Sequence, residues 1–119
     1  MKILINLIII IILSTILSCA FGPTSFNEMR SEIPHKKYTS FEPANEVAAC
    51  IVDELSKHEH WDVKMSPKEY GYTIHIILKG GHIDFLADIK DEEKGSSTTY
   101  YENSWQTKSY FDKKVIKCQ

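Results

Sequence analysis

Apolar residues follow three different patterns along the chain. Residues 3–17 form an almost unbroken apolar run, interrupted early by Asn6. Residues 44–57 place apolar side chains every three or four positions, which is typical of one buried face of a helix. From residue 61 the apolar positions alternate with polar ones, which is typical of strands. These patterns predict an apolar leader followed by a domain of the α+β class.

Two helices are predicted at the two ends of this domain. The first covers residues 44–57, follows Pro43 at a position where proline suits a helix entrance, and carries a stripe of Val47, Ile51 and Leu55 bordered by Cys50. The second covers residues 107–117, where one stripe contains Phe111, Val115 and Cys118. Both stripes are expected to face the same sheet.

Between these helices the alternating pattern predicts a four-stranded antiparallel meander. The first two strands, residues 61–65 and 70–78, are separated by a turn at residues 66–69. Gly80-Gly81 predicts a two-residue hairpin, and pairing across it puts every apolar residue on one face. The expected pairs are Leu78 with Ile83, Ile76 with Phe85, Ile74 with Ala87, and Tyr72 with Ile89.

The fourth strand is expected around residues 98–101, after a charged loop at residues 91–96. Whether Tyr100 or Tyr101 points inward depends on the conformation of that loop and is left open. The expected architecture is therefore a single α+β domain over residues 44–119, with both helices on one sheet face and the other face in solvent. Residues 19–43 are interpreted as a tether whose aromatic residues could dock on the domain: Phe26, Tyr38 and Phe41.

The first 18 residues have the layout of an export signal, with Lys2 before the apolar run and no basic cluster after it. The residues Ile16-Leu17-Ser18-Cys19 resemble the lipobox of bacterial lipoproteins. The resemblance implies cleavage before Cys19 and acylation of that cysteine, with several acyl chains giving stable anchoring. Ala20, rather than Asp, resembles lipoproteins sent to the outer membrane. The alternatives are ordinary cleavage that releases a protein beginning at Phe21, or an uncleaved anchor.

Charge and cysteine content narrow the classes of function. Removing residues 1–18 takes away Lys2 and leaves 13 basic and 16 acidic residues with interspersed signs, which does not favour binding to nucleic acid. Once Cys19 carries lipid, the two remaining cysteines are Cys50 and Cys118. In an oxidising exported compartment such a pair predicts a disulfide bond.

Few residues suggest catalysis or metal binding. The predicted register puts His75 on the polar face of the sheet with Asp84 and Asp88 as diagonal neighbours, which is the best candidate for an acid-base or metal site. His58-Glu59-His60 lacks the helical spacing of a zinc motif and is interpreted as a polar connection. No cofactor, metal or catalytic residue is therefore expected. An aromatic cluster would become a partner-binding patch if exposed: Tyr100, Tyr101, Trp105 and Tyr110.

These observations favour a membrane-anchored binding module of the cell envelope, of the immunity, exclusion, inhibitor or assembly type, with an envelope protein as its partner. A structural envelope lipoprotein is the alternative, and a small enzyme that uses His75, Asp84 and Asp88 is less favoured. The mature chain also resembles small lipoproteins of Gram-negative bacteria in Gly95-Ser96, Tyr100-Tyr101 and the terminal Cys118. That resemblance implies no particular activity.

Overall fold

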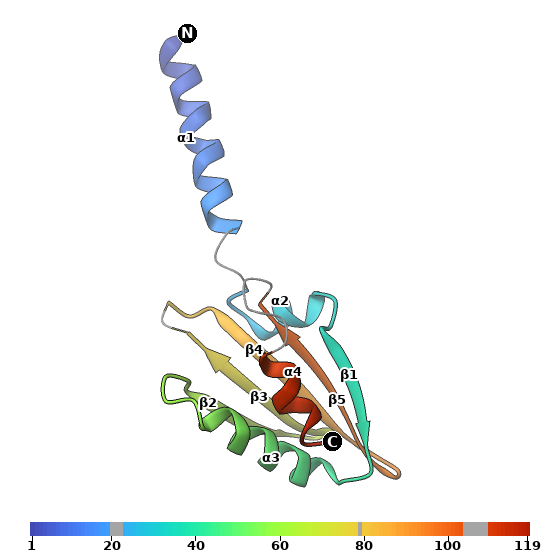
Figure 1. Ribbon diagram of the computed structural model, residues 1–119. Coiled ribbons are helices and arrows are strands. Elements are labelled where there is room, and N and C mark those ends of the chain that lie inside the picture. The colour runs from blue at the N-terminus through green and yellow to red at the C-terminus, as the bar shows by residue number, and fades with distance from the viewer. Residues whose placement is uncertain (20–22, 79, 104–109) are drawn as a thin grey trace.

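The computed structural model describes residues 1–19, 23–78, 80–103 and 110–119, with the side chains of residues 12–19 left aside. Figure 1 shows a leader helix attached to a small α+β domain. None of the helices within the described ranges has both the length and the hydropathy that crossing a membrane requires. The elements are α1 (Lys2–Cys19), α2 (Phe26–Ser31), β1 (Lys36–Ser40), α3 (Ala44–Ser56), β2 (Val63–Lys68), β3 (Gly71–Ile77), β4 (Ile83–Glu92), β5 (Gly95–Glu102) and α4 (Tyr110–Ile116).

The sheet is antiparallel and has five strands in the order β1-β5-β4-β3-β2. The α+β class is confirmed, but the predicted number of four strands is wrong. The fifth strand is β1, which pairs with β5 from Lys36 opposite Tyr100 to Ser40 opposite Ser96. Residues 36–40 were expected to belong to a tether, yet they complete the backbone hydrogen bonding of β5, which would otherwise be an exposed edge.

The predicted hairpin register is confirmed along most of β3 and β4. Ile76 lies opposite Phe85, Ile74 opposite Ala87, and Tyr72 opposite Ile89. The predicted pairing of Leu78 with Ile83 is wrong, because a bulge between Ile76 and Ile77 brings Ile77 opposite Ile83. Gly80 and Gly81 do supply the positive φ angles of the turn, 97° and 83°, but the turn spans more residues than a two-residue hairpin.

Other element boundaries also differ from those predicted from the sequence. The strand β2 runs through Pro67 to Lys68, so the predicted turn at residues 66–69 shrinks to Glu69 and Tyr70. An edge strand tolerates this proline because one side of its backbone needs no partner. The strands β4 and β5 extend into the predicted charged loop and meet at Glu93 and Lys94. The helix α4 is described from Tyr110, and the predicted start at residue 107 and Trp105 lie outside the described residues.

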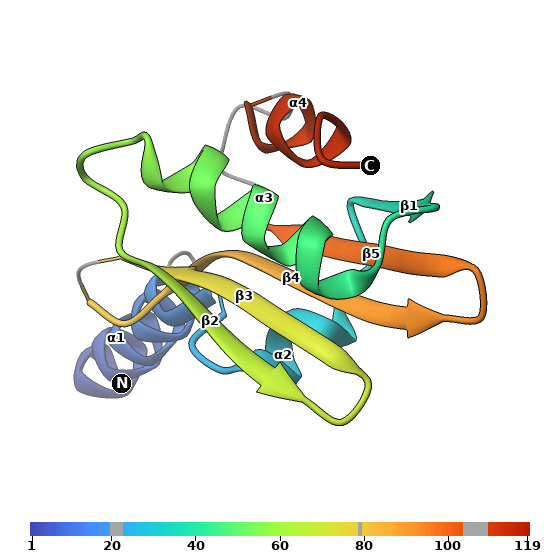
Figure 2. The ribbon, with the colours of Figure 1, turned by 90° about the horizontal axis from the view of Figure 1, so that it is seen from below.

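The main core lies between one face of the sheet and the helices α3 and α4, as predicted (Figure 2). Apolar side chains of α3 and α4 meet those of β3, β4 and β5, and all of them lose nearly all contact with solvent. The largest contributors are Ile51, Leu55, Ile74, Ile76, Phe85, Ile89, Tyr100 and Phe111. The ring of Phe111 lies 4.9 Å from that of Phe85, so α4 is held directly on the sheet.

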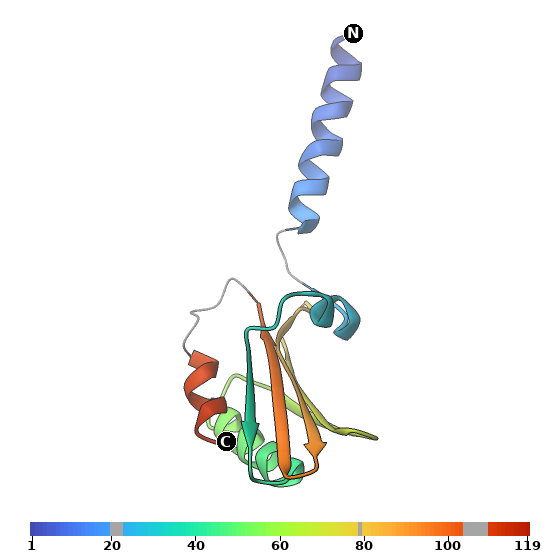
Figure 3. The ribbon, with the colours of Figure 1, turned by 90° about the vertical axis from the view of Figure 1, so that its right-hand side faces the viewer.

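A second core lies on the opposite face, under α2 (Figure 3). Met29 of α2 is fully buried against Ile83, Leu86 and Tyr101. The expectation of a solvated face is therefore wrong over the part that α2 covers. The reason is that residues interpreted as tether form a helix, whose N-terminus is capped by the Ser25 hydroxyl. Because both faces are covered there, Tyr100 and Tyr101 are both buried, on opposite faces.

The cysteine pair joins the two helices of the main core. The structure contains a disulfide bond between Cys50 in α3 and Cys118 just after α4, with 5.6 Å between their Cα atoms. The predicted pairing is confirmed by this geometry, which falls in the range that a disulfide requires. The bond closes a loop with a sequence separation of 68 residues.

Candidate functional site

The predicted polar site is enclosed. His75 lies opposite Leu86, as the register predicted, but His75, Asp84 and Asp88 are only 9%, 1% and 7% exposed. The ring of Phe26 in α2 lies 4.8 Å from the imidazole of His75. His75 and Asp88 therefore belong to the contact between α2 and the sheet, whereas Asp84 lies near Glu102. The expectation that they lie on the least covered face is corrected.

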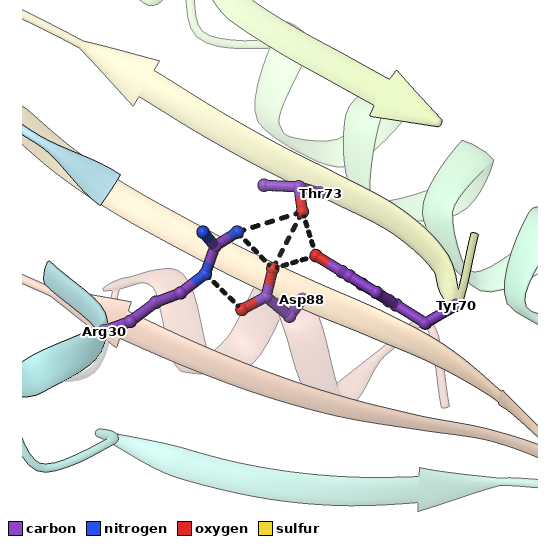
Figure 4. Close-up of polar contacts among 4 residues, drawn as sticks. All are labelled: Arg30, Tyr70, Thr73 and Asp88. Carbon is purple, nitrogen blue, oxygen red and sulfur yellow. Dashed lines mark hydrogen bonds and ion pairs between the residues drawn. The ribbon is translucent and has the colours of Figure 1, made fainter. Parts of the chain in front are cut away.

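Asp88 is the centre of a hydrogen-bond network that holds α2 (Figure 4). Arg30 donates from Nε to Oδ2 and from Nη2 to Oδ1 of Asp88, both at 2.9 Å. Tyr70 and Thr73 donate their hydroxyls to Oδ1 at 2.9 and 2.8 Å. Arg30 comes from α2, whereas the other three residues come from β3, β4 and the turn before β3. A two-pronged arginine contact of this kind fixes orientation as well as distance.

The pKa directions in this network agree with a structural role. Burial alone would raise the pKa of Asp88, but the hydrogen bonds from Arg30, Thr73 and Tyr70 outweigh it and leave the pKa lowered. Burial also lowers the pKa of His75. The carboxylate of Asp88 is thus saturated with donors, which suits an anchoring ion pair better than acid-base chemistry.

The segment His58-Glu59-His60, interpreted from the sequence as a polar connection, packs against aromatic side chains. His58, Glu59 and His60 form the turn between α3 and β2, and the ring of His58 stacks on Trp61 with 4.0 Å between centroids. Tyr110 closes over the same pair, with its ring 5.2 Å from that of Trp61. Across the described residues there is no group of three His, Cys, Asp or Glu side chains arranged to hold a metal ion.

A second buried polar cluster connects β1, β5 and α4. The hydroxyls of Tyr38 and Tyr100 both donate to Oδ1 of Asp112, and Lys36 donates to its Oδ2 at 3.0 Å. Burial followed by the contact with Asp112 raises the pKa of both tyrosines. This cluster gives the edge strand β1 a polar attachment to α4, and it explains why Tyr100 is buried without losing its hydroxyl partner.

Glu102 at the end of β5 has a strongly raised carboxyl pKa. Burial, with the nearby charges of Asp112 and Asp84, raises its pKa to about 7. Nδ1 of His35 lies 2.9 Å from Oε1 of Glu102. This contact places the segment before β1 against the end of β5. The sequence gives no indication of the surroundings of Glu102, because β1 and the preceding His35 lie within residues 19–43, which the pattern predicts to be a tether.

The most exposed aromatic side chain within the described ranges is Phe41, at 94%. Of the three aromatic residues expected to be able to dock from the tether, Phe26 and Tyr38 pack on the domain and Phe41 does not. The backbone beside Phe41 is held by two hydrogen bonds. The Ser40 hydroxyl accepts a hydrogen bond from the Glu42 N–H, and the Ser96 hydroxyl donates to the Glu42 carbonyl.

The chain at Gly95 passes very close to this corner. Gly95 has a φ of 123°, and a Cβ atom there would clash with the Ser40 carbonyl oxygen. The backbones at Ser40 and Gly95 are therefore in direct contact, with no room for a side chain at residue 95. We refer to residues 40–42 and the facing residues 92–96 as the Phe41 corner. It contains a hollow of about 430 Å³ lined by Thr39, Ser40, Phe41, Glu92, Glu93, Lys94 and Ser96.

The Phe41 corner is also acidic. Glu42, Glu46, Glu92 and Glu93 are all exposed around it, and the basic side chain lining the hollow is Lys94. The hydrogen bond and charge of Glu42 raise the pKa of Glu46, which shows that two carboxyl groups are close together there. Sequence could have indicated the acidic turn, but no sequence signal separates an outward Phe41 from an inward one.

Comparison with protein families, with curated proteins and with solved structures finds no match to this chain. The class of protein is therefore inferred from the leader, the fold and the surfaces described above.

Proposed function

We propose that this protein is a lipid-anchored lipoprotein of the bacterial cell envelope that binds a protein partner through the Phe41 corner. The observation that carries the binding role is the 94% exposure of Phe41 on a corner that the rest of the fold holds rigid. An exposed aromatic side chain on a rigid support loses little conformational entropy on binding.

The anchoring half of the proposal depends on the leader. The apolar run, the lipobox-like Ile16-Leu17-Ser18-Cys19 and Ala20 support acylation at Cys19 and transfer to the outer membrane, with the domain in the periplasm. The disulfide between Cys50 and Cys118 is consistent with an oxidising compartment.

The chemistry of the Phe41 corner indicates the kind of partner. Phe41 would enter an apolar pocket, and aromatic side chains that fill such pockets are common binding hot spots. The surrounding Glu42, Glu92 and Glu93 favour basic residues at the rim of that pocket. The corner lies at the end of the domain opposite the leader, where a membrane-anchored protein can present it to a partner (Figure 1).

The alternatives have weaker support. An enzyme that uses His75, Asp84 and Asp88 would need access to groups that are at most 9% exposed. A structural envelope lipoprotein needs no exposed aromatic side chain on a rigid corner. The geometry therefore favours the binding module over both.

The test is site-specific photo-crosslinking in intact cells. A photo-reactive amino acid at position 41 should yield one adduct of discrete mass, and the same residue at Ile116 should not. Ile116 is a matched control because it is also an exposed apolar position, 52% exposed, on α4. Equal crosslinking at both positions, or none at position 41, would refute binding through the Phe41 corner.

A second variant tests the charge preference. Glu42→Lys together with Glu93→Lys should reduce the yield of the adduct by about tenfold, since like charges across an interface suppress association. Both side chains are exposed, so the fold should be unchanged. An undiminished yield would contradict a basic partner while leaving the role of Phe41 intact.

A further inference from the structure

The chain between the lipidated cysteine and the folded domain is short. Pro23 is buried, and its carbonyl oxygen accepts a hydrogen bond from the Ile83 N–H at 2.9 Å. The next residues enter α2 directly, since Thr24 donates its N–H to Glu28 and Ser25 caps the helix. The predicted tether of residues 19–43 therefore reduces to the link from Cys19 to Pro23.

Covalent geometry limits the reach of this link. Four residue steps in a fully extended chain cover at most about 14 Å. The ten-residue strand β4, in contrast, is about 33 Å long at 3.3 Å per residue. The link therefore lets the domain move away from Cys19 by less than half the length of β4. With Cys19 acylated as proposed, the end of the domain at which Pro23 docks is the part nearest to the lipid headgroups.

Exposed aliphatic side chains lie at this same end. Ile77 lies opposite Ile83, the residue that binds Pro23, and Leu78 follows it in the β3–β4 turn. Ile33 lies in the connection between α2 and β1, which Figures 1 and 3 show at the leader end of the domain. Ile33, Ile77 and Leu78 are 93%, 44% and 36% exposed. We refer to these three residues as the anchor-side rim.

We infer that the anchor-side rim inserts into the headgroup boundary of the bilayer that carries acylated Cys19, and so fixes the domain with the Phe41 corner facing away. Branched aliphatic side chains gain by leaving water for this boundary. The described titratable groups near the rim are two carboxyl groups and three histidines, none of them a lysine or arginine: Glu32, Asp62, His35, His60 and His82. The contact therefore depends on apolar insertion and not on anionic lipid.

This inference rests on the acylation proposed for Cys19. The test uses the full lipidated protein reconstituted into phosphatidylethanolamine vesicles, with and without phosphatidylglycerol. A fluorescent non-natural amino acid is placed at position 33, 78 or 41. Brominated lipid should quench the fluorophore at positions 33 and 78 at least fivefold more than at the matched control position 41, whatever the phosphatidylglycerol content.

The outcomes separate this inference from the proposal on which it rests. The intact mass of the purified protein reports acylation of Cys19 directly, and an unacylated protein overturns both. An acylated protein with equal or no quenching at all three positions overturns only the insertion of the rim. Protection of position 78 from lipid, with crosslinking of that position to a protein in cells, identifies the rim as a protein-binding surface and also overturns it.

Discussion

At the scale of single residues, Glu102 shows how the environment changes an ordinary side chain. Its carboxyl group is 4% exposed and close to Asp84, Asp112 and His35. Burial in this setting penalises the charged form, and the pKa of Glu102 rises to about 7. The carboxyl of Glu102 is thus protonated in the folded protein over a range of pH in which it would be ionised in the unfolded chain.

This shift predicts a pH-dependent stability. The pKa of Glu102 is higher in the folded protein than in the unfolded chain. The stability that this shift contributes is therefore fully present below the ordinary pKa of 4.5, and it is lost as pH rises through about 7. Glu102→Gln should remove this loss and stabilise the protein at pH 8 by about 2 to 3 kcal/mol relative to wild type. Denaturant unfolding at pH 5, 6, 7 and 8 would measure the difference. Parallel curves for the two proteins would contradict it, and Glu59→Gln, at an exposed turn position, is the control.

His75 shows which of its properties its own strand can predict and which it cannot. The alternation of β3 correctly put it on the polar face, opposite Leu86. Its burial depends on Phe26, which lies 49 residues earlier in a helix that the local pattern did not indicate. A residue's side of the sheet follows from its strand, whereas its exposure follows from whatever covers that side.

At the scale of elements, α2 is the least predictable part of the domain and depends most on tertiary contacts. It has only six residues, too few for a stable isolated helix. Met29, Phe26 and the ion pair from Arg30 to Asp88 hold it on the sheet. The helix α3 is more than twice as long and has a continuous apolar stripe, which is why its pattern was sufficient to predict it.

The attachment of α2 can be tested with Arg30→Ala. The substitution leaves the buried Asp88 without its charged donor and should cost about 1 to 3 kcal/mol, less than a fully buried pair because the Arg30 side chain is 31% exposed. Amide hydrogen exchange of residues 26–31 should increase markedly, while α3 stays protected. Lys37→Ala, at an exposed position of β1, is the control. Unchanged exchange in α2 would show that the ion pair does not hold the helix.

At the scale of the whole molecule, the sheet is covered differently on its two faces. The helices α3 and α4 make the main core, and the disulfide from Cys50 to Cys118 joins them. The helix α2 covers part of the other face and follows Pro23, which docks on Ile83. The end of the domain nearest to α1 and the Phe41 corner are opposite ends of the sheet (Figure 1).

The disulfide predicts a measurable loss when it is removed. Cys50→Ser with Cys118→Ser should lower the free energy of unfolding by up to about 4 kcal/mol, because the bond restricts a loop of 68 residues in the unfolded chain. Alkylation of the native, unreduced domain followed by mass spectrometry should modify neither thiol. Two modified thiols would show that the pair is reduced in the native protein.

The amino-acid sequence alone was sufficient to predict the α+β class, α3, the pairing in the body of the β3–β4 hairpin and the partners of the disulfide. These features depend on local periodicity or on simple parity, which a single chain displays directly. Three features could be found only in the folded structure: β1 completes the sheet, α2 encloses His75 and Asp88, and Phe41 points outward. Each of these depends on contacts between segments far apart in the chain, and such contacts leave no periodic signal in the short segments that make them.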